Sequence, residues 1–152
     1  MKILLVDGSN VVRSAANHTV RSFEEERKDS EMLISLLNRA DSLSAFKIEV
    51  YFDGPKRRLE KEGNMDIFFS KYKKADENIV NAAASYKRDY KADTVFVVTS
   101  DRELGERCRA YGAIVVKSET LLNVWLEQKN NWLTQTCSDM MLSGTNYTIC
   151  RI

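Results

Sequence analysis

The stretch Lys2-Ile3-Leu4-Leu5-Val6-Asp7-Gly8-Ser9-Asn10 carries the strongest fold signal in the chain. Residues 3–6 are continuously apolar, which is typical of a strand buried on both faces of a parallel sheet. Asp7 ends this run, and the glycine after it allows a tight turn. Parallel α/β sheets bind their ligands at the carboxyl ends of their strands. The stretch therefore predicts a buried strand with a functional side chain, Asp7, at its end.

Two further strand-like runs end in the same way. Asp53 follows Val50-Tyr51-Phe52, Asp101 follows Val97-Val98-Thr99-Ser100, and Asp76 stands at the start of a predicted helix. Neighbouring parallel strands would bring these carboxylates to one edge of the sheet, where they repel one another unless a cation or shared protons balance them. Mg²⁺ or Mn²⁺ suits a site built from oxygen ligands. The first hypothesis is therefore a divalent-metal site that acts on phosphate esters.

Helix caps and turns are the alternative explanation for each acid. Aspartate and serine often cap the helix that follows them, Asp-Gly-Pro is an ordinary turn, and acids are favoured in the first turn of a helix. The residues open to these interpretations are Asp7 or Ser9, Asp53, Ser100 or Asp101, and Asp76 with Glu77. Caps alone do not require an aspartate at the end of every strand, so the conjunction favours the metal site.

Composition and periodicity indicate one α/β domain. The 152 residues are 43% hydrophobic and 30% charged, with a formal net charge of +1, so nucleic-acid binding would need a local basic patch. The chain has three cysteines, which lack metal-ligand spacing. It shows no signal peptide and no apolar run near the roughly 20 residues of a membrane span. These features predict a cytoplasmic protein.

Strands alternate with helices along the chain, which predicts a three-layer α/β/α domain with a mainly parallel sheet. We expect this domain to cover residues 1–133, followed by a tail, 134–152, without clear periodicity. The expected strands are 2–6, 47–52, 67–69, 94–99 and 113–116. The expected helices are 11–27, a helix capped by Asp29 or Ser30 that reaches Leu43, 75–90, 102–111 with Gly112 after its end, and 118–132.

The chain resembles the YacP-like group of NYN domains, which are PIN-like nucleases. The matching segments, in the family's order, are 3–11, 50–54, 74–79 and 97–102. The resemblance implies a PIN-like fold and an endoribonuclease that depends on Mg²⁺ or Mn²⁺ and acts on RNA near the ribosome. It also implies that the metal carboxylates are Asp7, Asp76 and Asp101, with Asn10, Ser100 and Asp53 in support, Glu77 as the alternative to Asp76, and Glu119 as a loose match to a further acid.

Basic residues near aromatic ones form the predicted RNA-binding surface, since cations neutralise phosphates and aromatic rings stack on bases. The cations are Lys56, Arg57, Arg58, Lys61, Lys71, Lys73, Lys74 and Arg102, and the candidate stacking residues are Tyr51, Phe68 and Tyr72. Such a groove fits single-stranded RNA better than a duplex. The alternative is an ordinary solvated face, because acids are interleaved among these cations.

Two other functions fit parts of the pattern. An RNA- or ribosome-binding module without catalytic activity would keep the basic segments and use the acids only as caps. A phosphatase of the haloacid-dehalogenase type also places an aspartate after its first strand, but it needs a second aspartate two positions later, where this chain has Ser9. The phosphatase is therefore the weakest of the three hypotheses.

Overall fold

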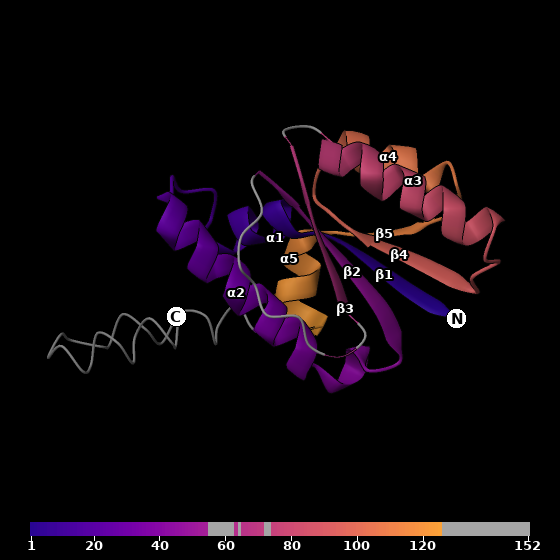
Figure 1. Ribbon diagram of the computed structural model, residues 1–152, viewed down its shortest axis with the longest axis horizontal. Coiled ribbons are helices and arrows are strands. Elements are labelled where there is room, and N and C mark those ends of the chain that lie inside the picture. Colours follow the sequence, from indigo (N-terminus) through magenta and orange to yellow (C-terminus); the bar gives the residue numbers. More distant parts are fainter. Residues whose placement is uncertain (55–62, 64, 72–73, 126–152) are drawn as a thin grey trace, which may run out of the picture.

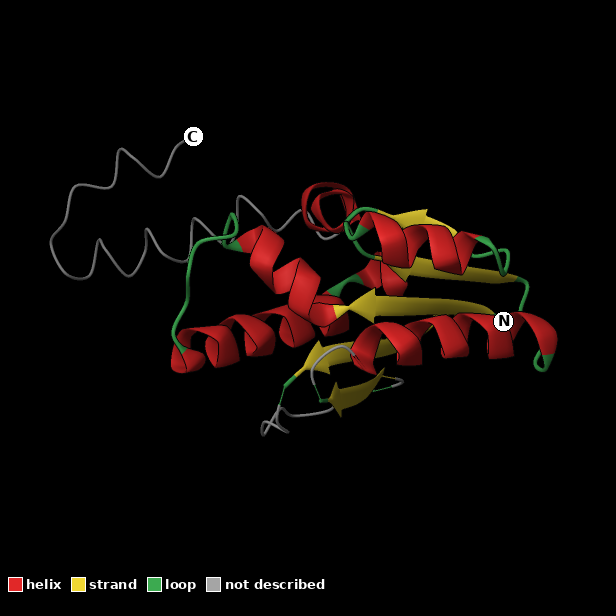
Figure 2. Ribbon diagram, turned by 90° about the horizontal axis from the view of Figure 1, so that it is seen from above, coloured by secondary structure: helices red, strands yellow, loops and turns green. Residues whose placement is uncertain are grey.

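The computed structural model describes residues 1–54, 63, 65–71 and 74–125 (Figure 1). Its strands are β1 (Lys2–Asp7), β2 (Phe46–Asp53), β3 (Met65–Ser70), β4 (Thr94–Val98) and β5 (Ile114–Val116). They form one five-stranded sheet in the order β3-β2-β1-β4-β5, and every neighbouring pair is parallel (Figure 2). The predicted α/β class is confirmed, with a sheet that is parallel throughout.

Helices cover both faces of the sheet and make a three-layer structure (Figure 1). One face carries α1 (Gly8–Ala15), α2 (Phe23–Arg39) and α5 (Ser118–Thr120), which continues into the π-helical segment η2 (Leu121–Trp125). The other face carries α3 (Lys74–Arg88) and α4 (Arg102–Arg109). A short 3₁₀ turn, η1 (Asp41–Leu43), leads into β2. Helices on both faces explain why the strands are apolar on both sides.

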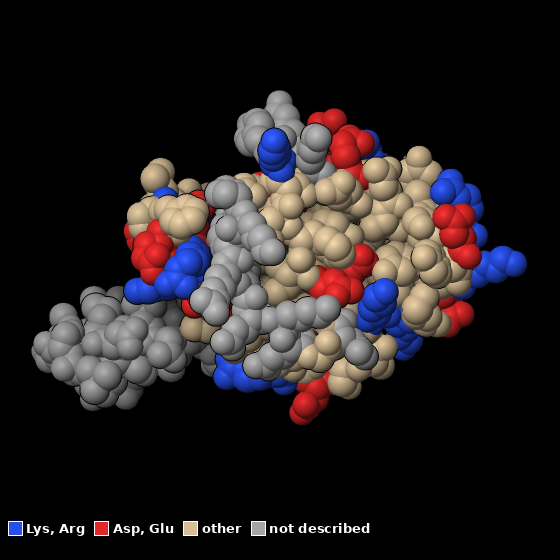
Figure 3. Space-filling view, in the orientation of Figure 1, with Lys and Arg blue, Asp and Glu red and all other residues tan. Residues whose placement is uncertain are grey.

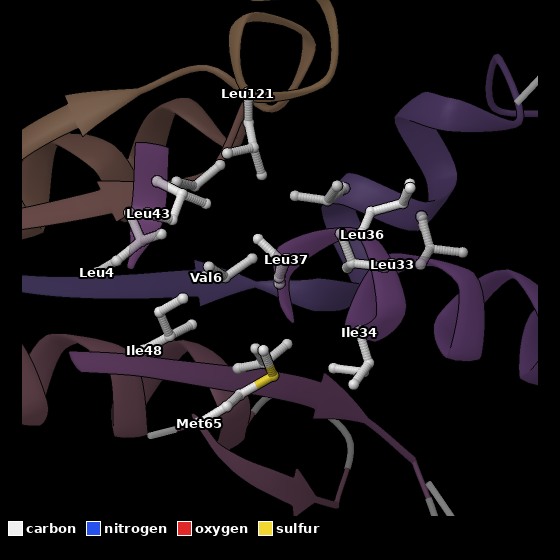
Figure 4. Packing of buried hydrophobic residues seen from close by; sticks show 14 of the residues in the cluster. Leu4, Val6, Leu33, Ile34, Leu36, Leu37, Leu43, Ile48, Met65 and Leu121 are labelled. Atoms are coloured by element: carbon white, nitrogen blue, oxygen red, sulfur yellow. The ribbon is translucent and has the colours of Figure 1, made fainter. Parts of the chain in front are cut away.

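The central strand β1 divides its side chains between two hydrophobic cores. Leu4 and Val6 pack in the core beneath α1 and α2, whereas Ile3 and Leu5 pack beneath α3 and α4. Figure 4 shows Leu4 and Val6 together with Leu37 of α2 in the first core. All four β1 side chains are fully buried. This two-sided burial holds the carboxyl end of β1, where the predicted site begins, in a rigid part of the fold.

The predicted single helix over 11–27 is wrong. Helix α1 ends at Ala15, and Asn17 and His18 follow in the left-handed region with φ of 52° and 59°. Left-handed residues cannot continue a right-handed helix, and asparagine tolerates this conformation better than most residues. The chain therefore turns here before α2 begins at Phe23.

Ser22, and not Asp29 or Ser30 as predicted, caps α2. The Ser22 hydroxyl accepts from the Glu25 N–H, and the Glu25 carboxylate accepts from the Ser22 N–H, each at 3.2 Å. This reciprocal capping box satisfies two backbone donors that would otherwise lack partners, so the helix starts about two turns earlier than its apolar periodicity indicates. Asp29 is buried inside α2, where Arg21 donates to both of its oxygens.

The later helices agree better with prediction. α3 and α4 lie within two residues of the expected bounds, and Gly112 after α4 has the expected positive φ of 89°. Of the predicted helix over 118–132, residues 118–125 are helical, and the rest lies outside the described residues together with the predicted tail 134–152. Across the described ranges, no helix combines the length and apolar character needed to cross a membrane.

Candidate active site

The candidate site lies at the point in the sheet where the chain stops adding strands on one side of β1 and begins to add them on the other. Strand β1 is central, with β2 and β3 on one side and β4 and β5 on the other. The connection from β1 to β2 runs through α1 and α2 on one face, whereas α3 lies on the opposite face before β4. Such a switch point leaves a crevice at the carboxyl ends of the two central strands. β1 ends at Asp7, and Thr99, Ser100 and Asp101 follow β4.

Asp7 is buried at the end of β1, with only 4% of its surface exposed. One carboxylate oxygen accepts from the Thr99 hydroxyl at 2.8 Å, and the other accepts from the Asn10 backbone N–H at 3.3 Å. Burial raises the pKa of Asp7 to about 6, and the nearby Asp76 carboxylate adds to this rise, although the two hydrogen bonds oppose it. The site therefore places a negative charge where water stabilises it poorly.

The other predicted acids influence the pKa of Asp76. Partial burial raises the pKa of Asp76, and the carboxylates of Asp101 and Asp53 raise it further, while Arg107 and Arg13 lower it. Asp76 therefore interacts electrostatically with Asp7, Asp53 and Asp101.

The capping interpretation is also correct for two of these residues. Asp7 accepts from the Asn10 N–H and so caps α1, and Asp101 accepts from the Leu104 N–H at 3.2 Å and caps α4. Capping and a site role are compatible, because an ionised carboxylate has about four lone-pair sites and the capping bond uses one of them. In Asp7 the second oxygen binds Thr99, and Asp101 is exposed.

Glu77 and Asp76 differ in their surroundings. Glu77 forms an ion pair with Arg107, with 2.7 Å between its Oε1 and Nη1 of the arginine, and Arg107 lowers the pKa of Glu77. Asp76 is half-buried, and its pKa is raised first by this burial and then by the carboxylates of Asp101 and Asp53. Of the two neighbouring acids, Asp76 has the environment expected of a cation ligand, while Glu77 is already balanced by an arginine.

Asn10 and Ser100 belong to a compact hydrogen-bond network. The Asn10 Oδ1 accepts from the Ser100 backbone N–H at 2.9 Å and from the Ser118 hydroxyl at 2.6 Å. The Ser100 hydroxyl donates to Glu119 at 2.6 Å and accepts from the Ser118 backbone N–H at 2.9 Å. This network joins α1, the end of β4 and the start of α5 on one side of the crevice.

Of the predicted Asp53-Gly54-Pro55 turn, Gly54 lies in a bend directly after β2, and Pro55 lies outside the described residues. Gly54 has a φ of 102°, and its N–H donates to the Ser70 carbonyl at 2.7 Å. The Asp53 N–H donates to the Ser9 hydroxyl at 2.8 Å, which ties the end of β2 to α1. Asp53 is thus both the last residue of β2 and one of the acids that raise the pKa of Asp76.

Gly8 is needed for a different reason from the one its sequence context indicates. Its φ is not positive, and it is the first residue of α1 rather than part of a special turn. A Cβ at this position would lie 2.6 Å from Cε1 of Phe52 and 2.9 Å from Cγ1 of Val50. Gly8 therefore allows α1 to start directly against β2, which places Asn10 beside Asp7.

The acids fit a hard cation in donor chemistry. Asp7, Asp76 and Asp101 offer only carboxylate oxygens, and burial together with the neighbouring Asp76 carboxylate raises the pKa of Asp7. Within the ranges that the structure describes, however, no three Asp, Glu, His or Cys side chains stand close enough together to form a complete metal-binding group.

The predicted RNA-binding residues are only partly visible. Lys71 and Arg102 are exposed, and Arg102 lies 3.4 Å from Glu106 in a surface ion pair. On the face shown in Figure 3, basic and acidic side chains are interspersed. The remaining predicted residues lie outside the described residues or have undescribed side chains: Lys56, Arg57, Arg58, Lys61, Tyr72, Lys73 and Lys74.

The prediction that Tyr51 could stack on a base is wrong. It is 4% exposed, and its hydroxyl donates to the buried Glu49. Phe68 is 40% exposed and stacks on Tyr51 with 5.0 Å between the ring centroids. Only Phe68 of this pair can meet a base.

Four residues near the site were not singled out from the sequence. Thr99 and Ser118 bind Asp7 and Asn10, and Arg13 and Arg107 act on the acids electrostatically. Ser118 had a usable signal, because it follows β5 closely, in the same way that Ser100 follows β4. The arginines lie on helix surfaces and had none.

Comparison with known proteins agrees with this fold. The family model described as "YacP-like NYN domain" matches residues 4–147. The crystal structure of Rae1 (YacP) from Bacillus subtilis is 21% identical and superposes with a TM-score of 0.68, covering 95% of this chain and 84% of that one. A variant of the same protein is 22% identical, with a TM-score of 0.65 over 91% of this chain and 82% of that one.

No curated protein sequence matches the chain significantly. The family model nevertheless spans almost the whole chain and extends into the segment after residue 133. The chain therefore belongs to the YacP-like NYN domain family, a group of PIN-like nucleases.

Proposed function

We propose that this protein is an endoribonuclease that depends on Mg²⁺ or Mn²⁺ and hydrolyses phosphodiester bonds in RNA. The observation that carries the proposal is the buried Asp7 carboxylate at the switch point of the sheet, with Asp76, Asp101 and Asp53 in the same electrostatic environment. A perturbed acid in such a crevice is a functional-site candidate on physical grounds. Membership of a nuclease family supports the same reaction.

Asp7, Asp76 and Asp101 are the residues that would hold the cation. When bound, Mg²⁺ or Mn²⁺ would make a water a better nucleophile and neutralise charge on the scissile phosphate. Thr99 holds the Asp7 carboxylate in one orientation, and the caps that Asp7 and Asp101 form fix both acids relative to α1 and α4. Asn10 and Ser100 would line the crevice, and Asp53 and Glu77 would flank it.

Cations beside these acids would position the RNA. Arg13 and Arg107 both lower the pKa of Asp76. Arg102 and Lys71 are exposed, and they lie close in sequence to Asp101 and Asp76 respectively. These side chains would contact phosphates of a single strand, with Phe68 available for stacking. The family resemblance further suggests a substrate at the ribosome and hence a cytoplasmic enzyme.

The test is cleavage of a single-stranded RNA with Mn²⁺, compared with EDTA. The wild type should cut internally only with Mn²⁺, and Asp7→Asn should lose this activity while keeping its fold. Asp93→Asn is the matched control, because Asp93 pairs with the N-terminal ammonium group outside the crevice. Undiminished Mn²⁺-dependent cleavage by Asp7→Asn would rule out the proposed role.

A binding module without catalytic activity is the second candidate. It is favoured by the complete capping bonds of Asp7 and Asp101, which account for both acids without a metal. Calorimetry separates the two functions. RNA binding without any Mn²⁺ binding would identify the module, whereas Mn²⁺ binding that Asp7→Asn abolishes would identify the enzyme.

A further inference from the structure

The hydrogen bonds of Asn10 determine which end of its amide faces the network. The Ser100 backbone N–H can only donate, so the Asn10 atom that it meets at 2.9 Å must be the carbonyl oxygen. The Ser118 hydroxyl occupies the second lone pair of this oxygen at 2.6 Å. Both acceptor positions of Oδ1 are then filled. The Nδ2 group is left with no partner among the described residues.

The partners of Asn10 are themselves held in single orientations. Ser118 is fully buried, and its backbone N–H donates to the Ser100 hydroxyl. The Ser100 hydroxyl gives its only hydrogen to Glu119, and this bond lowers the pKa of Glu119, consistent with an ionised acceptor. Ser100 therefore has no hydrogen left for a substrate. Among the Asn10, Ser100 and Ser118 side chains, the donor left without a partner in this network is the NH₂ group of Asn10.

We propose that Ser118 is a positioning residue that fixes the Asn10 amide with its NH₂ group toward the crevice, where it donates to a phosphate oxygen of the bound RNA. This inference rests on the proposed function and assigns Asn10 a specific part in it. An amide NH₂ cannot bind a cation, and the Asn10 oxygen is already occupied, so Asn10 contacts the anionic substrate and not the metal.

Asn10→Asp tests the donor directly. The aspartate keeps an oxygen for Ser100 and Ser118 but replaces the NH₂ group with a second acceptor. Loss of one preorganised donor to a reacting phosphate should reduce kcat about 100-fold. Mn²⁺ binding should not weaken, because no metal ligand is removed. Cleavage by Asn10→Asp close to the wild-type rate would overturn the inference.

Ser118→Ala tests the positioning role. It removes the hydroxyl bond to Asn10 but keeps the backbone bond to Ser100, so the loop should retain its shape. The loss of one neutral hydrogen bond should lower kcat about three- to tenfold. Ser30→Ala is the matched control, since it removes another buried serine hydroxyl, which donates to the Glu26 carbonyl in α2. Equal loss of activity in both variants would mean that Ser118 has only a structural role.

NMR of the Asn10 side-chain NH₂ signal gives a readout independent of turnover, with assignment from its absence in Asn10→Asp. Titration with a single-stranded RNA in EDTA should shift this signal in the wild type. In Ser118→Ala the signal should move toward that of a free asparagine. Signals of other crevice residues that move while the Asn10 NH₂ signal stays in place would overturn the inference.

The role of Asn10 and the proposed nuclease function would be refuted by different results. Mn²⁺-dependent cleavage with an unmoved Asn10 NH₂ signal would refute the role of Asn10 alone. A shifted NH₂ signal without cleavage would support that role and refute the catalytic function. No cleavage with Mn²⁺, together with an RNA titration that moves no crevice signal, would refute both.

Discussion

Asp7→Asn should make the metal-free protein more stable at neutral pH while it abolishes activity. Burial raises the pKa of Asp7 from 3.8 to about 6, so the folded state binds this proton more tightly than the unfolded state does. Stability from this residue is present at low pH and is lost as the pH rises from about 4 to about 6. An asparagine is neutral throughout this range and does not carry that cost.

The magnitude follows from the two pKa values. A tenfold change in proton affinity corresponds to about 1.4 kcal/mol, so the rise from 3.8 to about 6 amounts to about 3 kcal/mol at pH 8. Asp7→Asn also weakens the bond from Thr99, which costs about 1 kcal/mol. The variant should therefore exceed the wild type by about 2 kcal/mol at pH 8 and should lose this advantage near pH 4.

Urea denaturation in EDTA at pH 8, 6 and 4 measures these differences. Asp93→Asn is an internal control of opposite sign, because the N-terminal ammonium group lowers the pKa of Asp93. Its contribution to stability is present at pH 8 and is lost as the pH falls below 4, so its removal should matter only at the higher pH. A stability difference between Asp7→Asn and the wild type that does not vary from pH 4 to 8 would refute the assigned burial cost.

Three further predictions concern the metal and the scaffold. Mn²⁺ at 100 times its Kd should raise the free energy of unfolding of the wild type by about 2.7 kcal/mol and leave Asp7→Asn unchanged, and equal stabilisation of both would argue against Asp7 as a ligand. Gly8→Ala should cost about 2 kcal/mol in urea denaturation, because its Cβ would overlap Phe52; an unchanged midpoint would show that the ring can move aside. Arg21→Ala should cost about 2 kcal/mol because it leaves the buried Asp29 without its two donors, and the loss should shrink if Asp29→Asn is added.

The strands and the edge on which the site lies could be predicted from local sequence. The unbroken apolar run of residues 3–6 has one good explanation, a strand covered on both faces, and Asp7 marks its end. Parallel strands place their carboxyl ends at one edge, so the sharing of one crevice by Asp7 and Asp101 follows from topology. The apolar spacing predicted the helix boundaries less well. The Ser22–Glu25 capping box and the left-handed Asn17 set them, although the apolar spacing predicted otherwise.

The sequence by itself thus determined the fold class and the candidate acids, because unbroken apolar runs and the residues at their ends are local properties. Only the tertiary structure decided how those residues are used. Thr99 reaches Asp7 across 92 positions, and Ser118 reaches Asn10 across 108. The pKa of Asp7 depends on burial by segments far away in the chain. The difference between the surroundings of Asp76 and Glu77 depends on Arg107 of α4, which pairs with Glu77. Such contacts arise from packing between elements, which the periodicity within any one element does not report.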